Sequence, residues 1–376
     1  MKNTLLIGGD VAPMPGSRNA FLAACEDPSA LLRDGLAELW LSAGARVFNL
    51  ECPITDREAP IEKCGPNLRA AADCAGGIGA LSPTAVALAN NHILDQGPDG
   101  IFRTIQALLE QGIPAFGAGE NAQKADKSYS FSFAGRNVTL WAVCEHEFSA
   151  ASEQGAGANA LEPLTLGDRI RGMKQNCDYL IVLYHGGREY DPYPSPNLQK
   201  RCRRMGEWGA DLILCQHSHC VGSMENWGDC AIVYGQGNFL FDLDGEPEAF
   251  DTGLLISLDF SERGKPALDF VPVGRKEHGA ELLHGEKAKA LLSSFAARSE
   301  ELKKPGFVEE RYRAYGEAYR ERMLKVFLSG NPLLKAVNVL YGRRPSRVYS
   351  PETLRAIRNS LECESINELL IQGIKE

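Results

Sequence analysis

Residues 179–187 read Tyr-Leu-Ile-Val-Leu-Tyr-His-Gly-Gly, an apolar run that stops on a histidine and two glycines. A short continuous apolar run of this kind is typical of a strand buried on both faces. Four other apolar runs lead to polar clusters in the same way: Thr4–Gly9 to Asp10, Arg46–Phe48 to Asn49-Leu50-Glu51, Ala85–Ala89 to Asn90-Asn91-His92, and Asp211–Cys215 to Gln216-His217-Ser218-His219. The five segments favour an α/β fold built on buried strands.

Helices are expected between these strands. Apolar residues recur at helical spacing over residues 29–40, 98–111 and 195–208. Two later runs, residues 253–260 and 268–273, are expected to form a closing β-hairpin. Alternating strands and helices are the pattern of a layered α/β domain.

The composition changes after residue 275 to Ala, Glu, Lys and Arg at helical spacing, with breaks at Pro305-Gly306 and Gly330-Asn331-Pro332. We therefore predict an α/β domain over residues 1–275 and a helical C-terminal extension over residues 276–376. Apolar side chains at helical spacing most often pack in a core, so no chemistry is assigned to them.

Charge and cysteine content restrict the partners and the compartment. The formal net charge of −9 gives no support to a nucleic acid or an anionic membrane as partner. The eleven cysteines are scattered without a Cys-x-x-Cys pair, which favours a reducing compartment. The N-terminal residues lead directly into the first strand-like run, and no window is apolar enough to span a bilayer. We expect a cytoplasmic protein.

The polar clusters share the chemistry of a metal site. Ligands of α/β folds gather beyond the carboxyl ends of the strands, where these clusters stand. The candidate ligands combine carboxylate, amide oxygen and imidazole: Asp10, Glu51, Asn91, His185, His217 and His219. This mixture suits one or two divalent ions such as manganese, iron or zinc, and suits calcium poorly. On an extended backbone His217 and His219 would point the same way and could bind neighbouring ions.

Each cluster also has a structural interpretation. Asp10 after two glycines fits a turn, Glu51 fits a solvated strand end, and Asn90-Asn91-His92 fits a helix cap. His185 and the His217-Ser218-His219 segment, at the ends of buried strands, are harder to explain structurally. The ordered set is more specific for a metal site than any single member.

In order, these motifs resemble the CapA family of bacterial capsule (poly-γ-glutamate) synthesis proteins, which is similar in fold to the calcineurin-like metallophosphoesterases. The match is closest over Tyr184–Tyr190, Gln216–His219 and Tyr234–Phe241, and it covers roughly residues 4 to 245. The resemblance implies a four-layer α/β/β/α sandwich with a two-metal site at the strand ends. The C-terminal extension lies outside it.

The resemblance also implies roles for individual residues. Asn91, His185 and His217 would bind one ion, Asp10 and His219 the other, and Glu51 would bridge them. His92 resembles the residue that protonates a leaving group or stabilises the developing charge in phosphoesterases. Arg188 is our own candidate for an anion clamp, because its planar cationic group suits carboxylate or phosphate.

Two positions depart from the phosphoesterase pattern. Ala12 stands where a histidine usually follows the first aspartate by two residues. The second motif normally supplies an aspartate, whereas here Glu51 must serve, with Asn49 as the competitor for that role. The ion at Asp10 therefore has fewer expected protein ligands.

Two functions follow from this pattern. The first is a metal-dependent hydrolase in which activated water attacks a phosphoester or a γ-glutamyl amide and His92 acts as acid. The second is a non-catalytic role in making or exporting a capsule polymer, with the same pocket used for binding. The expected partner is accordingly a small molecule or an anionic polymer.

Overall fold

The computed structural model describes residues 1–326, 332–342 and 344–373 of the chain. The chain divides into two compact units, Met1–Val308 and Glu309–Glu376. Every residue predicted to form the site belongs to the first unit. The predicted break at Gly330-Asn331 lies outside the described residues.

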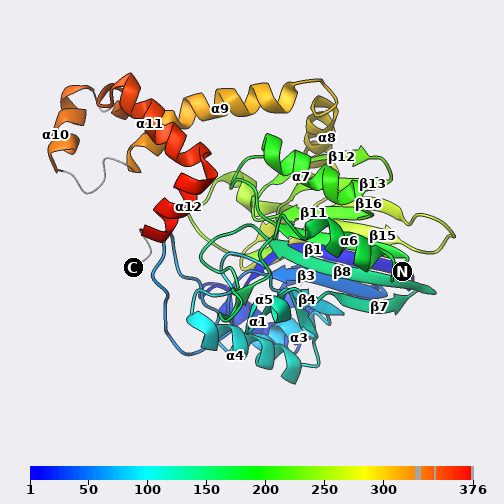
Figure 1. Ribbon diagram of the computed structural model, residues 1–376. Coiled ribbons are helices and arrows are strands. Elements are labelled where there is room, and N and C mark those ends of the chain that lie inside the picture. The colour runs from blue at the N-terminus through cyan, green and yellow to red at the C-terminus, as the bar shows by residue number, and fades with distance from the viewer. Residues whose placement is uncertain (327–331, 343, 374–376) are drawn as a thin grey trace. The chain divides into compact units, whose positions relative to one another are not determined.

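The larger sheet of the first unit holds the N-terminal strands (Figure 1). Its order is β2 (Leu32–Arg33), β17 (Gly279–Leu282), β16 (Ala267–Lys276), β15 (Thr252–Asp259), β1 (Thr4–Ala12), β3 (Ala45–Leu50), β4 (Ala85–Ala87) and β5 (Ala115–Phe116), with β14 (Asn238–Phe241) also paired to β1. Strands β1, β3, β4 and β5 run parallel, so their carboxyl ends share one edge. β15 and β16 pair antiparallel, which confirms the predicted closing hairpin.

The second sheet supplies the histidines. Its order is β12 (Val221–Trp227), β13 (Cys230–Gln236), β11 (Leu212–Gln216), β10 (Tyr179–His185), β8 (Arg136–Cys144) and β7 (Tyr129–Phe133). β8, β10, β11 and β13 run parallel. A separate short pair joins β6 (Ala118–Gly119) to β9 (Gly157–Ala158).

Alternating side chains divide the first unit into layers. Ile7 of β1 and Ile181 of β10 are buried in one apolar cluster between the sheets. Leu6 faces a second cluster shared with the helices of the larger sheet, and Val182 faces a third shared with those of the smaller sheet. Neighbouring residues of a strand point to opposite faces, so both sheets are covered on both sides.

Helices complete the sandwich. The larger sheet is covered by α1 (Arg18–Ala24), α2 (Leu36–Ser42), α3 (Cys74–Ala80) and α4 (Gly97–Glu110). The smaller one is covered by α6 (Leu166–Lys174) and α7 (Pro196–Glu207), on the opposite side of the sheets in Figure 1. The short helix α5 (Ala122–Ala125) leads into β7. This confirms the predicted four-layer α/β/β/α sandwich of the metallophosphoesterase type.

The helix predicted over residues 29–40 is wrong in its first half. That stretch holds a short 3-10 turn (Pro28–Ala30) and β2, and only α2 is helical. Asp34 and Gly35 have φ of 53° and 85°, in the left-handed region that interrupts a helix. Pairing of β2 with β17 therefore prevails over helical periodicity here.

The C-terminal part of the chain is helical, as predicted. After β17, α8 (Gly285–Glu301) still belongs to the first unit. Its Arg298 donates to the carbonyls of Val221 and Gly222 in β12. α9 (Phe307–Leu324) leads into the second unit, with α10 (Pro332–Leu340), α11 (Pro351–Glu362) and α12 (Glu364–Gly373). The domain boundary at residue 275 remains a prediction. Among the described residues, none of the helices has both the length and the apolar character that a membrane crossing needs.

Candidate metal centre

The predicted ligands stand at the carboxyl ends of adjacent strands. β1 supplies Asp10, β3 leads to Glu51, β4 to Asn91, β10 to His185, and β11 to His217 and His219. The two sheets face each other, so both sets of strand ends meet. The backbone N–H of His217 donates a hydrogen bond to the side-chain Oδ2 of Asp10 at 3.0 Å, which connects the edges of the two sheets.

Two groups of side chains come close enough to hold an ion. Glu51, His185 and His217 form one group, and Asp10, Glu51 and His219 form the other. Within each group the potential ligand atoms lie within 4.8 Å of one another, and all members are buried. Glu51 belongs to both groups, the position that a bridging carboxylate would occupy.

His185 and Glu51 are at the centre of this arrangement. His185 Nε2 lies 3.2 Å from Glu51 Oε1 and 3.0 Å from Asn91 Oδ1. His219 Nε2 lies 3.8 Å from the same Glu51 oxygen. The rings of His185 and His217 have centroids 4.9 Å apart. The structure thus brings all six predicted ligands together, and their assignment to individual ions remains a proposal.

Buried polar atoms that make no hydrogen bond indicate whether these residues could hold a cation. Both carboxylate oxygens of Glu51 and Nδ1 of His217 are buried without a hydrogen-bond partner. Buried polar atoms are rarely left unsatisfied, because each one loses its bonds to water. Oxygen and imidazole nitrogen are ligands of divalent transition metals. The residues present therefore fit a bound divalent cation.

Burial also determines the protonation of these groups. Burial and the nearby charge of Asp10 raise the pKa of Glu51 well above its ordinary 4.5. Burial lowers the pKa of His185, and burial together with the other histidines lowers the pKa of His217 well below 6.5. The imidazoles are therefore held neutral, which is the state that binds a metal, whereas Glu51 must lose a proton first.

Asn49 supports the ligands and is a poor competitor for the role of Glu51. Its Nδ2 donates to Asp10 Oδ1 at 2.8 Å, and its Oδ1 accepts from Asn90 Nδ2 at 3.0 Å. Both ends of the Asn49 amide thus hold hydrogen bonds, whereas neither oxygen of Glu51 makes one, although Oε1 lies 3.2 Å from His185 Nε2. Side chains that orient ligands in this way strengthen metal sites.

The His217-Ser218-His219 segment is not extended, contrary to expectation. β11 ends at Gln216, and His217 and His219 have φ of 82° and 49°. Non-glycine residues in this left-handed region carry strain of about 1–3 kcal/mol each and cluster at functional sites. Both rings still reach Glu51, through a tight turn rather than through strand alternation.

His92 belongs to a charged cluster that the sequence analysis missed. Its Nδ1 lies 2.6 Å from Asp95 Oδ2, and Lys63 bonds the other oxygen of Asp95. A carboxylate only accepts, so Nδ1 carries the proton and Nε2 is the ring nitrogen left for other partners. The His-x-x-Asp spacing was a usable signal for Asp95, whereas Lys63 has no local signal. A third missed residue is Asn238, whose Oδ1 lies 3.0 Å from His219 Nδ1.

Arg188 and Ala12 are the two remaining positions from the sequence analysis. Arg188 is half-buried in the turn three residues after His185, and its role as an anion clamp remains a proposal. Ala12 is fully buried, and its backbone pairs with Phe241 of β14.

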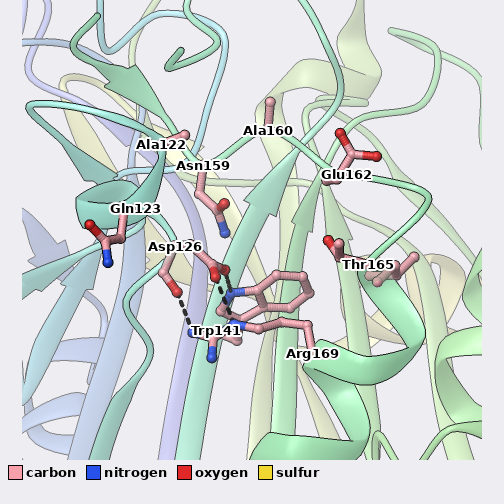
Figure 2. Close-up of a pocket in the computed structure, with 10 residues that line it drawn as sticks. Ala122, Gln123, Asp126, Trp141, Asn159, Ala160, Glu162, Thr165 and Arg169 are labelled. Atoms are coloured by element: carbon pink, nitrogen blue, oxygen red, sulfur yellow. Dashed lines mark hydrogen bonds and ion pairs between the residues drawn. The ribbon is translucent and has the colours of Figure 1, made fainter. Parts of the chain in front are cut away.

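A pocket of about 240 Å³ lies elsewhere in the first unit (Figure 2). There Asp126 accepts a hydrogen bond from Trp141 Nε1 at 2.9 Å and pairs with Arg169 Nε at 2.7 Å. None of the predicted site residues lines this pocket. It is therefore separate from the metal centre.

Fold and site together define a metallophosphoesterase-type sandwich with a potential metal centre at its strand ends. The model of the family described as "Bacterial capsule synthesis protein PGA_cap" matches residues 4–243, which include all six predicted ligands. The chain belongs to this family.

Curated relatives agree with this assignment. The chain is 30% identical over 200 residues to "Capsule biosynthesis protein CapA" of Bacillus anthracis, covering 52% of this chain and 48% of the relative. It is 28% identical over 194 residues to "PGA biosynthesis protein CapA" of Bacillus subtilis, covering 50% of each. The chain spans about half the length of these relatives. A solved structure of a hypothetical protein from Thermus thermophilus aligns with a TM-score of 0.43 at 14% identity, covering 73% of this chain and 100% of that one.

Proposed function

We propose that this chain is a metal-dependent hydrolase of the capsule synthesis family, acting on a phosphoester or a γ-glutamyl amide. The observation that supports it most is the carboxylate of Glu51, which makes no hydrogen bond and is shared by two buried histidine-containing groups. A purely structural carboxylate buried this deeply would be expected to hold hydrogen bonds. Glu51 instead has oxygens available for a cation.

A divalent cation held by these residues would supply a Lewis acid and a water nucleophile near neutral pH. The chain's own residues would do the rest. His92, held at Nδ1–H by Asp95, would accept at its free Nε2 the proton that the attacking water loses, and would pass that proton to the leaving group. Arg188 would bind the anionic part of the substrate. Asn49 would keep Asp10 oriented through its 2.8 Å bond.

Metal analysis and a substrate panel test this proposal. Purified wild type should contain manganese, iron or zinc and should hydrolyse an aryl phosphoester or a γ-glutamyl anilide after manganese is added. His185→Ala and His217→Ala should each lower metal content and abolish turnover. His284→Ala is the matched control, because His284 lies outside the site and its side chain caps no helix bond. A metal-free wild type without turnover on either substrate would exclude the hydrolase.

A second candidate is a non-catalytic role in synthesis or export of an anionic capsule polymer. It is favoured by Ala12, which leaves the Asp10 group with fewer ligands, and by the capsule-related names of the relatives. Binding of poly-γ-glutamate should then survive His92→Ala unchanged. The hydrolase instead requires that His92→Ala lose turnover while metal content stays.

A cytoplasmic location is part of the same proposal. It is supported by the cysteines, all eleven of which are free. Cys202 and Cys215 place their sulfurs 3.8 Å apart in a hydrogen bond, and both are free thiols, as suits a reducing compartment. Cell fractionation tests the location directly, and recovery outside the cytoplasm would contradict it.

A further inference from the structure

The 59–68 segment, between β3 and α3, is fastened to the residues that follow His92. Ile61 N donates to the Asp95 carbonyl at 3.2 Å, and Leu68 N donates to Asp95 Oδ2 at 2.6 Å. Gln96 Nε2 in turn donates to the Leu68 carbonyl at 3.2 Å. Asp95 therefore serves both the segment and the histidine.

Lys63 belongs to the 59–68 segment, and its side chain lies against Asp95 and His92. Its side chain is only 3% exposed, and Asp95 is fully buried. The ammonium bonds Asp95 Oδ1 and lies 3.2 Å from His92 Nδ1. A buried ammonium is costly to desolvate unless it is paired, so this placement is specific. Lysine is otherwise among the residues most often exposed.

The Asp95 carboxylate is thereby saturated. One oxygen takes Lys63, and the other takes His92 Nδ1 and the Leu68 amide. Without Lys63 the carboxylate would be a buried charge balanced by no other cation among these contacts. It would then be free to rotate or to take up a proton, and either change would release Nδ1 of His92.

We propose that Lys63 is a positioning residue for His92. It balances the charge of Asp95 and fixes that carboxylate, which keeps the His92 ring with Nδ1–H bonded and Nε2 available. Docking of the 59–68 segment and orientation of His92 are thus coupled through Asp95. The inference deepens the proposed hydrolase and rests on it, since His92 is the proposed proton donor there.

The chain offers a matched control for a lysine that is only structural. Lys174 Nζ bonds Asp211 Oδ2 at 2.7 Å, and the same oxygen accepts from Leu180 N at 2.7 Å. This repeats the lysine, carboxylate and backbone amide of the Lys63 cluster, and no histidine is bonded to it in the described contacts. Lys174→Met should therefore affect stability without affecting proton transfer.

Two substrates with different leaving groups can distinguish a positioning role of Lys63 from a merely structural one. An aryl ester with a nitrophenolate leaving group needs little protonation, whereas an alkyl ester of the same acid needs a proton donor. In the metal-loaded full chain, Lys63→Met should lower kcat/KM for the alkyl ester at least about tenfold and for the nitrophenyl ester less than about threefold. Lys174→Met should change the two equally. An equal loss on both substrates in Lys63→Met would overturn the proposal.

A double variant keeps the test usable if Lys63→Met alone does not fold. Because Lys63 is argued to act only through Asp95, adding Lys63→Met to Asp95→Asn should change the alkyl-ester rate less than about twofold. Independent, multiplying losses would contradict the coupling. In both variants the metal content should match that of wild type.

Histidine NMR distinguishes failure of this inference from failure of the hydrolase. In protein labelled with ¹⁵N-histidine, His92 should be the Nδ1–H tautomer in wild type and a mixture of tautomers in Lys63→Met. Lys174→Met should leave the His92 signals unchanged. If wild type hydrolyses neither ester, the proposed hydrolase function is wrong, and the tautomer of His92 alone then tests the role of Lys63. An unaltered tautomer in Lys63→Met makes Lys63 merely structural.

Discussion

Replacing Glu51 by glutamine removes one negative charge from the centre of the site and keeps the shape of the side chain. Glu51 is fully buried, and neither of its oxygens has a hydrogen-bond partner. Glutamine has nearly the same size and would be equally buried, so the burial of a polar side chain is common to both proteins. What differs is the ability to ionise.

The sign of the pH dependence follows from the raised pKa. Burial and Asp10 raise the pKa of Glu51 well above 4.5, so the folded protein binds this proton more tightly than the unfolded chain. The contribution of Glu51 to stability is full below pH 4.5 and is lost as pH rises through the raised pKa. Each pH unit in that window costs about 1.4 kcal/mol. Glu51→Gln lacks this loss, because an amide does not titrate.

Metal binding should reverse the order of the two proteins. A cation present at about 100 times its Kd stabilises the folded state by about 2.7 kcal/mol. If the loss of Glu51 weakens binding about 100-fold, the same concentration stabilises the variant by only about 0.4 kcal/mol. Metal-free wild type should thus be the less stable protein at about pH 8, and manganese-loaded wild type the more stable one.

Urea unfolding at about pH 5, 6, 7 and 8, with EDTA or with manganese, measures all these differences. Glu225→Gln is the control, because Glu225 pairs with Arg203 outside the metal centre and its replacement should leave the manganese effect intact. The reasoning is refuted if metal-free wild type and Glu51→Gln keep a constant difference across that pH range. It is equally refuted if manganese stabilises Glu51→Gln as much as wild type.

Three other predictions concern the surroundings of that carboxylate. Gly9→Ala would place a Cβ 2.0 Å from the Gly237 carbonyl oxygen, so it should destabilise the fold by about 1–3 kcal/mol or more in urea unfolding and lower metal content. Gly172→Ala, which meets nothing within 4 Å, is its control and should not destabilise. Asn49→Ala should lower metal affinity about 10–100-fold by isothermal calorimetry, because Asp10 loses its 2.8 Å bond; unchanged affinity would make Asn49 irrelevant. Metal binding should release protons from the shared carboxyl group, whose pKa is raised, and not from His185 or His217, whose pKa values are lowered; calorimetry in buffers of different ionisation enthalpy would show this release.

Much of the fold was predictable because its signals are local. Continuous apolar runs identify strands buried on both faces, and a run that ends on histidine or an acid identifies the edge where ligands gather. All six expected ligands meet there in the structure. The helix expected over residues 29–40 failed because β17 offers β2 a pairing partner that lies far along the chain.

The supporting residues could not be predicted in this way. Lys63 is separated from His92 by 29 positions and lies in a segment without regular structure. Asn49 was visible in the sequence, but its role depends on which atoms of Asp10 and Asn90 it meets. Side chains that orient ligands have no period and no fixed spacing, so only the assembled sheet identifies them.

Ala12 lies where strand β1 pairs with strand β14, and this pairing also affects the metal centre. It lies two residues beyond Asp10 on β1, fully buried, and its backbone pairs with Phe241 of β14. The same pairing sets Asn238 opposite Asp10, and that amide bonds His219. β14, the strand that pairs with Ala12, thus supplies a residue that orients His219. The two groups of side chains are unequal, because Asn91 adds an oxygen beside His185 to the group of Glu51, His185 and His217. The proposed hydrolase would therefore depend on that group first.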